Sequence, residues 1–158
     1  RHDHNTMPPA AKTTGNYVNS SLAKVEALQA GYDEAVMLAP NGLVAECSGE
    51  NLFVARHGTL LTPPLSAGAL EGITQNTVMT IAADLGFEAR TDNLARSDLY
   101  IAEEAFVVGT AAEVSSVNSV DDREIPCPGP MTRAIAETYG DAVRGKVDRY
   151  RHWCELVG

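Results

Sequence analysis

Two turn dipeptides, Asn41-Gly42 and His57-Gly58, each lie between short apolar runs of the sequence. The runs cover residues 35–38, 43–45, 52–55 and 59–62. Glycine accepts the positive φ that a tight hairpin turn requires, and Asn-Gly is among the strongest hairpin signals. We therefore expect two antiparallel β-hairpins in the first half of the chain, which restricts the fold to classes that contain antiparallel sheet.

Helical patterns alternate with these strands. Val18, Leu22, Val25 and Leu28 recur at helical spacing, and Gly31 follows as a C-terminal cap. A second helix is predicted after Thr74, which would cap it, and Gly86 would end it. Two more helices are predicted, one beginning at Pro130 and one over residues 147–157. Further strands are predicted at residues 87–90, 105–108 and 114–120, with a turn at 121–122. The class is therefore mixed α and β.

Composition limits the function more than the fold. A length of 158 residues fits one domain. The net charge of −9 argues against nucleic-acid binding, which needs clustered Lys and Arg. No run approaches the roughly 20 apolar residues of a membrane span, and the polar start does not resemble a secretory signal. The three cysteines show no disulfide or zinc spacing, which favours a cytoplasmic protein without a metal site.

Two motifs contain residue types suited to chemistry. Lys12, one of three lysines, begins the run Lys12-x-x-Gly15-Asn16-Tyr17. A longer gapped pattern reads Glu46-x-Ser48-x-x-Asn51-Leu52-Phe53, six residues, Leu60-x-Thr62, seven residues, Leu70-x-Gly72-Ile73. Taken one at a time, these residues have ordinary explanations: a surface lysine, a solvated glutamate and a helix-capping threonine. The combined spacing is much more specific than any single residue.

Together the two motifs resemble the fold-type IV pyridoxal-phosphate enzymes, most of all the branched-chain amino-acid aminotransferases. The resemblance covers about residues 7–157. It implies a D-amino-acid-aminotransferase-like larger domain of mixed α/β class, a pseudo-barrel of mostly antiparallel strands surrounded by helices. Residues 1–10 would be an interdomain connector, and residues 11–158 would form the C-terminal domain that binds pyridoxal 5'-phosphate.

The resemblance also implies roles for single residues around the cofactor ring. Lys12 would be the catalytic Schiff-base lysine. Glu46 would pair with the pyridine nitrogen and keep it protonated, so that the ring withdraws electrons. Tyr17 would contact the phenolate oxygen of the cofactor, and Leu70 would pack on one face of the ring.

Other residues would hold the phosphate and the substrate. Ile73 and Thr74 lie where the start of a helix would offer backbone N–H groups to the phosphate. Thr110 would contact both phosphate and substrate, and the N–H groups near Ala111 and Ala112 would meet the substrate carboxylate. One departure is Gln75, where the family usually has Lys or Arg, and we expect it to alter pairing on the helix surface or at an interface.

The implied activity is transamination of L-branched-chain amino acids with 2-oxoglutarate, in a homodimer or a higher homo-oligomer. Gly109-Thr110-Ala111-Ala112-Glu113-Val114 and Tyr150-x-x-Trp153 favour this group. D-amino-acid transaminases, (R)-amine transaminases, aminodeoxychorismate lyases and a non-catalytic domain remain open. Family members carry a further domain before the lysine, and the first residue here is not Met. We therefore expect this chain to be a fragment that binds cofactor weakly and turns over little.

Overall fold

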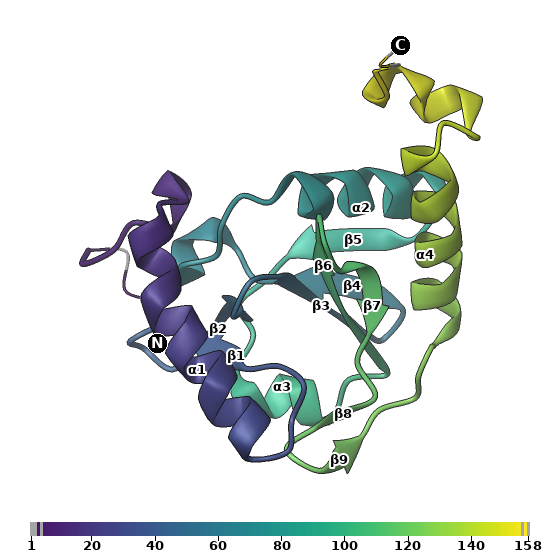
Figure 1. Cartoon of the computed structure of the whole chain (residues 1–158). Coiled ribbons are helices and arrows are strands. Elements are labelled where there is room, and N and C mark those ends of the chain that lie inside the picture. Colours follow the sequence, from purple (N-terminus) through teal and green to yellow (C-terminus); the bar gives the residue numbers. More distant parts are fainter. Residues whose placement is uncertain (1–2, 4, 156, 158) are drawn as a thin grey trace.

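A computed structural model describes residues 3, 5–155 and 157 (Figure 1). Its centre is a five-stranded sheet in the order β5-β4-β3-β6-β7, in which β4 and β5 are parallel and the other neighbours are antiparallel. Two small antiparallel pairs, β1–β2 and β8–β9, flank it. The strands are β1 Val36–Leu38, β2 Val44–Cys47, β3 Asn51–Arg56, β4 Thr59–Thr62, β5 Glu88–Thr91, β6 Glu104–Gly109, β7 Glu113–Ser116, β8 Ser119–Val120 and β9 Arg123–Glu124.

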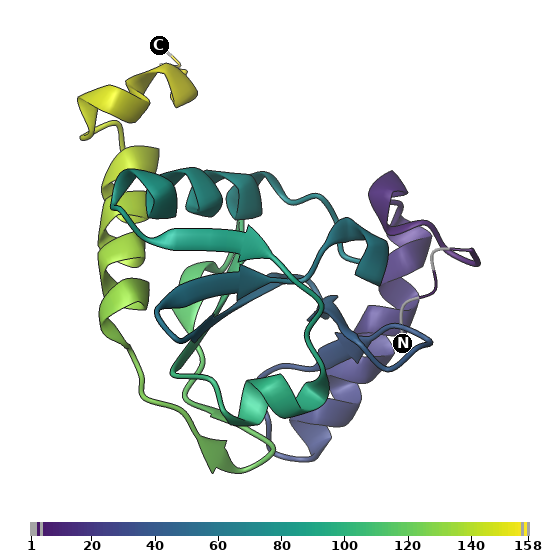
Figure 2. The same ribbon diagram turned by 180° about the vertical axis from the view of Figure 1, so that it is seen from behind.

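Helices surround the sheet. Figures 1 and 2 show α1 and α4 on opposite sides of the molecule, with α2 against α4 and α3 on the other face of the central sheet. The α-helices are α1 Tyr17–Gln29, α2 Ile73–Asp84, α3 Arg96–Tyr100 and α4 Pro130–Val143. The 3-10 helices are η1 Pro9–Ala11, η2 Thr14–Asn16, η3 Leu65–Ala67 and η4 Asp148–Trp153. None of the helices in the described part of the chain is long and apolar enough to cross a membrane.

The predicted hairpins are confirmed. β1 pairs with β2, and β3 pairs with β4 across a two-residue turn in which both His57 (φ 51°) and Gly58 (φ 75°) have positive φ. The turn after β8 has the same property at Asp121 (φ 48°) and Asp122 (φ 63°). Such turns match the twist of the strands that they join. The local turn chemistry therefore sets the strand register.

Strand β3 lies in the middle of the sheet and is buried on both faces. Phe53 and Ala55 point into a core shared with α2 and α4, whereas Leu52 and Val54 point into a second core shared with α3 and the β1–β2 pair. Phe53 stacks on the ring of Phe106 from β6 with centroids 5.0 Å apart. Because successive side chains alternate between the faces, burial of both requires the nearly continuous apolar run that this strand has.

A buried carboxylate determines where α4 begins. Pro130 takes the first helical position, as predicted. Glu104, at the start of β6, accepts hydrogen bonds from the N–H groups of Met131 (3.1 Å) and Thr132 (2.8 Å) and from the Thr132 hydroxyl (2.7 Å). A carboxylate at a helix N-terminus satisfies N–H groups that the helix leaves unpaired. This contact joins α4 to the central sheet.

Several expectations differ from the structure. The five-stranded sheet is open and mixed; it does not close into the expected pseudo-barrel. Thr74 does not cap α2, because the helix begins at Ile73 after Gly72, and Thr74 is buried in the first turn. The strand predicted over residues 114–120 is interrupted after Ser116, since the chain leaves the sheet and starts the separate β8–β9 hairpin. The predicted last helix is limited to η4, and residue 156 of that stretch lies outside the described residues.

Helix α1 forms where the spacing predicts it, and Gly31 follows in a left-handed conformation (φ 90°). Its apolar stripe is not covered, however. Val18, Leu22, Val25 and Leu28 are 50–66% exposed, although such a stripe usually faces a core. The helix is held instead by polar contacts from Lys24, whose Nζ lies 2.6 Å from Glu34 Oε2 and 2.5 Å from the Asp33 carbonyl oxygen.

Candidate functional site

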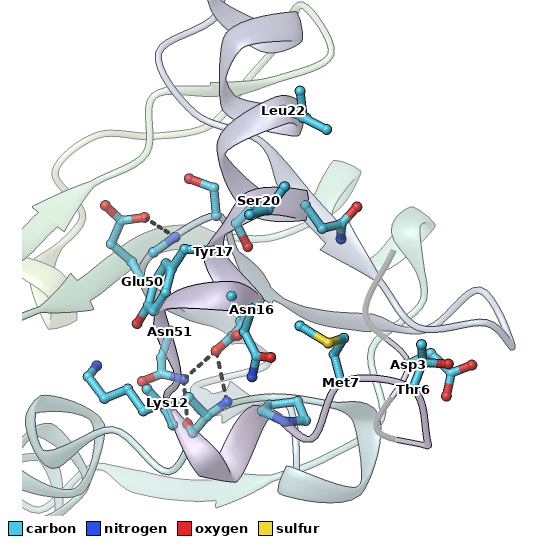
Figure 3. Close-up of a pocket in the computed structure, with 18 residues that line it drawn as sticks. Asp3, Thr6, Met7, Lys12, Asn16, Tyr17, Ser20, Leu22, Glu50 and Asn51 are labelled. Atoms are coloured by element: carbon cyan, nitrogen blue, oxygen red, sulfur yellow. Dashed lines mark hydrogen bonds between the residues drawn. The ribbon is translucent and has the colours of Figure 1, made fainter.

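A cavity of about 530 Å³ lies between the N-terminal segment, the start of α1 and the β2–β3 turn (Figure 3). It is lined by four of the predicted site residues, namely Lys12, Tyr17, Glu46 and Leu70. They come from three separate parts of the chain. The remaining wall comes mainly from the start of α1, from residues 48–51, and from Asp3, Thr6, Met7 and Pro9. The fold thus brings an amine, a phenol, a carboxylate and an apolar side chain to one cavity.

Lys12 lies between the two short 3-10 helices η1 and η2. Its backbone is left-handed (φ 45°, ψ 37°), and its N–H donates to the Pro9 carbonyl at 3.0 Å. A left-handed residue other than glycine costs roughly 1–2 kcal/mol. Such strained residues are concentrated at functional sites. The Lys12 side chain is exposed, and it extends along the same end of the cavity as Tyr17 and Asn51 in Figure 3.

Glu46 is the most firmly held of the four residues. It is half-buried on β2, and its Oε2 accepts hydrogen bonds from the Leu70 N–H (2.9 Å) and the Asn51 amide (3.4 Å). The same Asn51 amide nitrogen donates to the Leu70 carbonyl at 2.9 Å. These bonds fix the carboxylate next to the Leu70 backbone, so the acid and the apolar wall form one unit.

Tyr17 and the lysine segment are connected to the N-terminal segment. Tyr17 is the first residue of α1, and its side chain is 37% exposed at the cavity. The neighbouring Asn16 amide donates to the Pro8 carbonyl at 2.8 Å, and its backbone N–H donates to the Thr13 carbonyl at 3.0 Å. Residues 8–17 therefore fold back on themselves, and this local folding positions both Lys12 and Tyr17.

Ile73 and Thr74 do not line this cavity. The Ile73 side chain is 79% exposed and lines a second hollow beside the start of α2, and the Thr74 side chain is buried. Gly72, which precedes the helix, provides no side-chain cap. Gln75 is not on the helix surface as expected. It is buried, and its amide donates to the Thr62 hydroxyl at 3.0 Å, so it supports the core rather than an exposed pair.

Thr110, Ala111 and Ala112 form the turn between β6 and β7 and are also absent from the cavity wall. Thr110 and Ala111 are exposed. The preceding Gly109 lies against the β2–β3 turn, because a Cβ on it would lie 3.6 Å from Glu50 Cγ. The turn is therefore beside the cavity rim, with small side chains that leave its backbone accessible.

Three charged groups next to the cavity are electrostatically linked. Burial raises the pKa of Glu50, and the neighbouring Glu34 carboxylate raises it further. Burial also acts to raise the pKa of Glu34, but hydrogen bonds from Lys24, Ser48 and Ala35 outweigh it, so the pKa is lowered. The Glu34 hydrogen bond raises the pKa of Lys24. Of the two carboxyl groups, the one whose pKa is raised is therefore Glu50, which lines the cavity.

Cys47, next to Glu46, is structural. Burial raises the pKa of its thiol well above the usual value, and the Glu34 and Glu50 carboxylates add to the effect. A thiol with a raised pKa forms little nucleophilic thiolate. Within the described residues, no group of three or more His, Cys, Asp and Glu side chains could hold a metal ion.

Asn51 also lines the cavity, although no role was predicted for it. It belongs to the gapped motif, and asparagine is an uncommon choice at the start of a buried strand. Those two features of the sequence are the signal that could have drawn attention to Asn51. Its partners could not be identified from the sequence, because Glu46 and Leu70 lie 5 and 19 residues away along the chain.

Comparisons with known proteins identify the family of this chain. The family model described as "Amino-transferase class IV" matches residues 1–120. The chain therefore belongs to the class IV aminotransferase family. A probable branched-chain-amino-acid aminotransferase of Aquifex aeolicus (strain VF5) is 48% identical over 160 residues, which is 99% of this chain and 51% of the relative.

Solved structures give the same result. The branched-chain aminotransferase of Thermoproteus uzoniensis with norvaline superimposes with a TM-score of 0.94 at 50% identity, over 97% of this chain and 51% of that one. Another branched-chain amino acid aminotransferase, from T.th. and complexed with N-(5'-phosphopyridoxyl)-L-glutamate, gives 0.96 at 46% identity, over 100% and 53%. The chain thus spans about half the length of the relatives that it matches.

Proposed function

We propose that this chain is the cofactor-binding part of a pyridoxal-phosphate-dependent aminotransferase that acts on L-branched-chain amino acids with 2-oxoglutarate. Residues 11–158 would form the cofactor domain, residues 1–10 the connector to a second domain, and the whole protein a homodimer or higher homo-oligomer. The observation that carries the proposal is the shared cavity of Lys12 and Glu46. Family membership and the half-length match to branched-chain aminotransferases support it.

The residues of the cavity suit the cofactor. An amine beside a phenol, a carboxylate held by two donors, and an apolar wall at Leu70 match an aldehyde, a basic ring nitrogen and a flat ring. When bound, pyridoxal phosphate supplies an electron-withdrawing ring that accepts the electron pair left on the substrate's α-carbon. Glu46 would keep the ring nitrogen protonated, Tyr17 would orient the ring by its hydroxyl, and Leu70 would cover one face.

Lys12 would have two roles. Its Nζ would attach the cofactor covalently, and once displaced by the substrate amine it would take the proton from the substrate's α-carbon. Both roles require an amine on a mobile side chain. The Lys12 side chain is exposed, which leaves it room to change position.

The phosphate would be held by backbone groups rather than by side chains within this cavity. The first N–H groups of α2, at Ile73 and Thr74, have no side-chain cap, and a helix N-terminus favours an anion. Thr110 would add its hydroxyl. Ala111 and Ala112, in the accessible turn after β6, would offer N–H groups to the substrate carboxylate.

The substrate proposal rests on the relatives. One is described with norvaline, an apolar amino acid, and one with a phosphopyridoxyl adduct of L-glutamate, the amino acid formed from 2-oxoglutarate. In this chain by itself the cavity leaves Lys12 and Tyr17 exposed. We therefore expect weak cofactor binding and little turnover from the 158 residues alone, with full activity only when the remaining part of the enzyme closes the site.

Covalent trapping tests the proposal directly. The chain is incubated with excess pyridoxal phosphate, reduced with borohydride, digested and analysed by mass spectrometry. We expect the label on Lys12 and its loss in Lys12→Ala, with Lys146→Ala as the control that keeps it. No label, or a label spread evenly over Lys12, Lys24 and Lys146, would overturn the proposal. For the full-length enzyme, activity on L-Leu and L-Val without activity on D-Ala would support the branched-chain substrates.

A further inference from the structure

Asn51 is a polar side chain buried at the start of β3, with only 6% of its surface exposed. Its amide nitrogen donates to the Leu70 carbonyl (2.9 Å) and to Glu46 Oε2 (3.4 Å). Leu70 in turn donates its N–H to the same Glu46 oxygen at 2.9 Å. The three groups form a closed ring of hydrogen bonds, in which a change at Asn51 affects both the carboxylate and the loop that carries Leu70.

The other side of the Asn51 amide is packed against the start of α2. A Cβ added to Gly72 would lie 2.1 Å from Asn51 Oδ1 and 3.3 Å from its Cγ. The Gly72 backbone (φ −78°, ψ 132°) is one that any residue adopts. Glycine is therefore required at position 72 because Asn51 occupies the space of a side chain, not because of backbone strain.

We propose that Asn51 is a positioning residue that sets the Glu46 carboxylate and the N-terminus of α2 in a fixed arrangement. The inference rests on the proposed function, in which Glu46 meets the ring nitrogen and the α2 N-terminus meets the phosphate. These two groups would bind two parts of one small ligand at the same time, so a fixed separation between them favours binding. Asn51 contacts both: the carboxylate through its amide nitrogen, and Gly72 through its amide oxygen.

The packing part of the proposal is tested by a double-mutant cycle on the cofactor-free chain. Gly72→Ala alone should lower the thermal unfolding midpoint by about 5 °C or more, because the new methyl meets Asn51 Oδ1. In an Asn51→Ala background the same change should have almost no further effect, since the nearest remaining contact would be Gln75 Cβ at 3.6 Å. If Gly72→Ala lowers the unfolding midpoint equally in both backgrounds, the proposed contact between Gly72 and Asn51 is wrong.

The positioning part is tested by the pyridoxal phosphate concentration that gives half-maximal borohydride labelling of Lys12. Asn51→Asp keeps the shape of the side chain but replaces its donor with an acceptor facing Glu46. We expect at least a tenfold rise in that concentration. Asn93→Asp makes the same charge change at an exposed asparagine and should leave it unchanged. If Asn51→Asp does not fold, Asn51→Ser, which is too short to reach Glu46, should give the same direction.

A second control separates positioning from stability. Thr132→Val removes a buried hydroxyl at the start of α4 that donates to Glu104 Oε2 at 2.7 Å, and Thr132 does not line the cavity. It should lower the unfolding midpoint but leave the half-labelling concentration unchanged. If Asn51→Asp also leaves that concentration unchanged, the inference alone is wrong. If the unaltered chain takes no label on Lys12, the proposed function is wrong and the inference fails with it.

Discussion

Lys12 and Glu46 line one cavity, but the segments that carry them are built differently. Glu46 belongs to a strand beside the second core and is fixed by two hydrogen-bond donors. Lys12 lies in an exposed segment between two 3-10 helices, and the helix that follows exposes its apolar stripe. The acid side of the site is therefore set by the sheet, whereas the lysine side is held mainly by local backbone contacts.

This difference suits the proposed chemistry. A partner for a ring nitrogen must stay at one position, but an amine that first binds a cofactor and then moves a proton must change position. The exposed stripe of α1 also adjoins the site, because Val18 and Leu22 line the cavity. The less firmly held half of the site is thus the half that the proposed chemistry requires to move.

The largest expected contrast is between the two apolar helix faces. Ile135 of α4 is fully buried, so Ile135→Ala should cost about 2–5 kcal/mol of unfolding free energy. Leu22 of α1 is 66% exposed, so Leu22→Ala should change it by no more than about 0.5 kcal/mol. Urea unfolding of both variants measures this. A loss of several kcal/mol in Leu22→Ala would mean that the stripe is covered in solution.

The next contrast concerns the two chemical residues themselves. Glu46→Ala leaves the Leu70 N–H without its acceptor and removes one of the two acceptors of the Asn51 amide, which should cost about 1–3 kcal/mol. Lys12→Ala removes an exposed side chain and should leave the unfolding free energy unchanged within error. Both variants should lose cofactor attachment, as measured by trapping. Glu46→Gln, which keeps an acceptor oxygen, should retain most of the stability and therefore separates the two effects. Equal stability of Glu46→Ala and Lys12→Ala would contradict the comparison.

The smallest effect is a pH dependence at the cavity rim. The pKa of Glu50 is raised, first by burial and then by Glu34, so the fold favours its protonated form. Ionised Glu50 therefore lowers stability above the raised pKa, and this cost disappears as the pH falls to the ordinary glutamate value. Glu50→Gln should raise the unfolding midpoint slightly at about pH 7 and not at about pH 4. Glu26→Gln, an exposed control, should show no such difference, and a gain that is larger at the acidic pH would reverse the assignment.

Much of the fold could be predicted, because its signals are local. His57-Gly58 and Asn41-Gly42 identify their turns through residues that accept positive φ, and Gly31, Gly86 and Pro130 mark helix ends through backbone chemistry alone. The parallel pairing of β4 with β5 and the open sheet depend on contacts between distant segments. The same holds for the exposed face of α1: periodicity predicts a helix but not what covers it.

The candidate site was predictable to a similar degree. The motif spacing selected Lys12, Tyr17, Glu46 and Leu70, which share the cavity. It could not show that Thr74 is buried in the first turn of α2 or that Gln75 turns inward to Thr62, because both depend on how α2 packs against the sheet. The proposed role of Asn51 could not be predicted for the same reason. That role depends on three contacts of the Asn51 side chain that form only when the chain folds.

A crystal structure of the chain soaked with pyridoxal phosphate tests the central claim most directly. The account predicts continuous density from Lys12 Nζ to the cofactor, with the ring nitrogen within hydrogen-bond distance of the Glu46 carboxylate. A cofactor attached to Lys24 or Lys146, or one joined to Lys12 with its ring nitrogen turned away from Glu46, would contradict it.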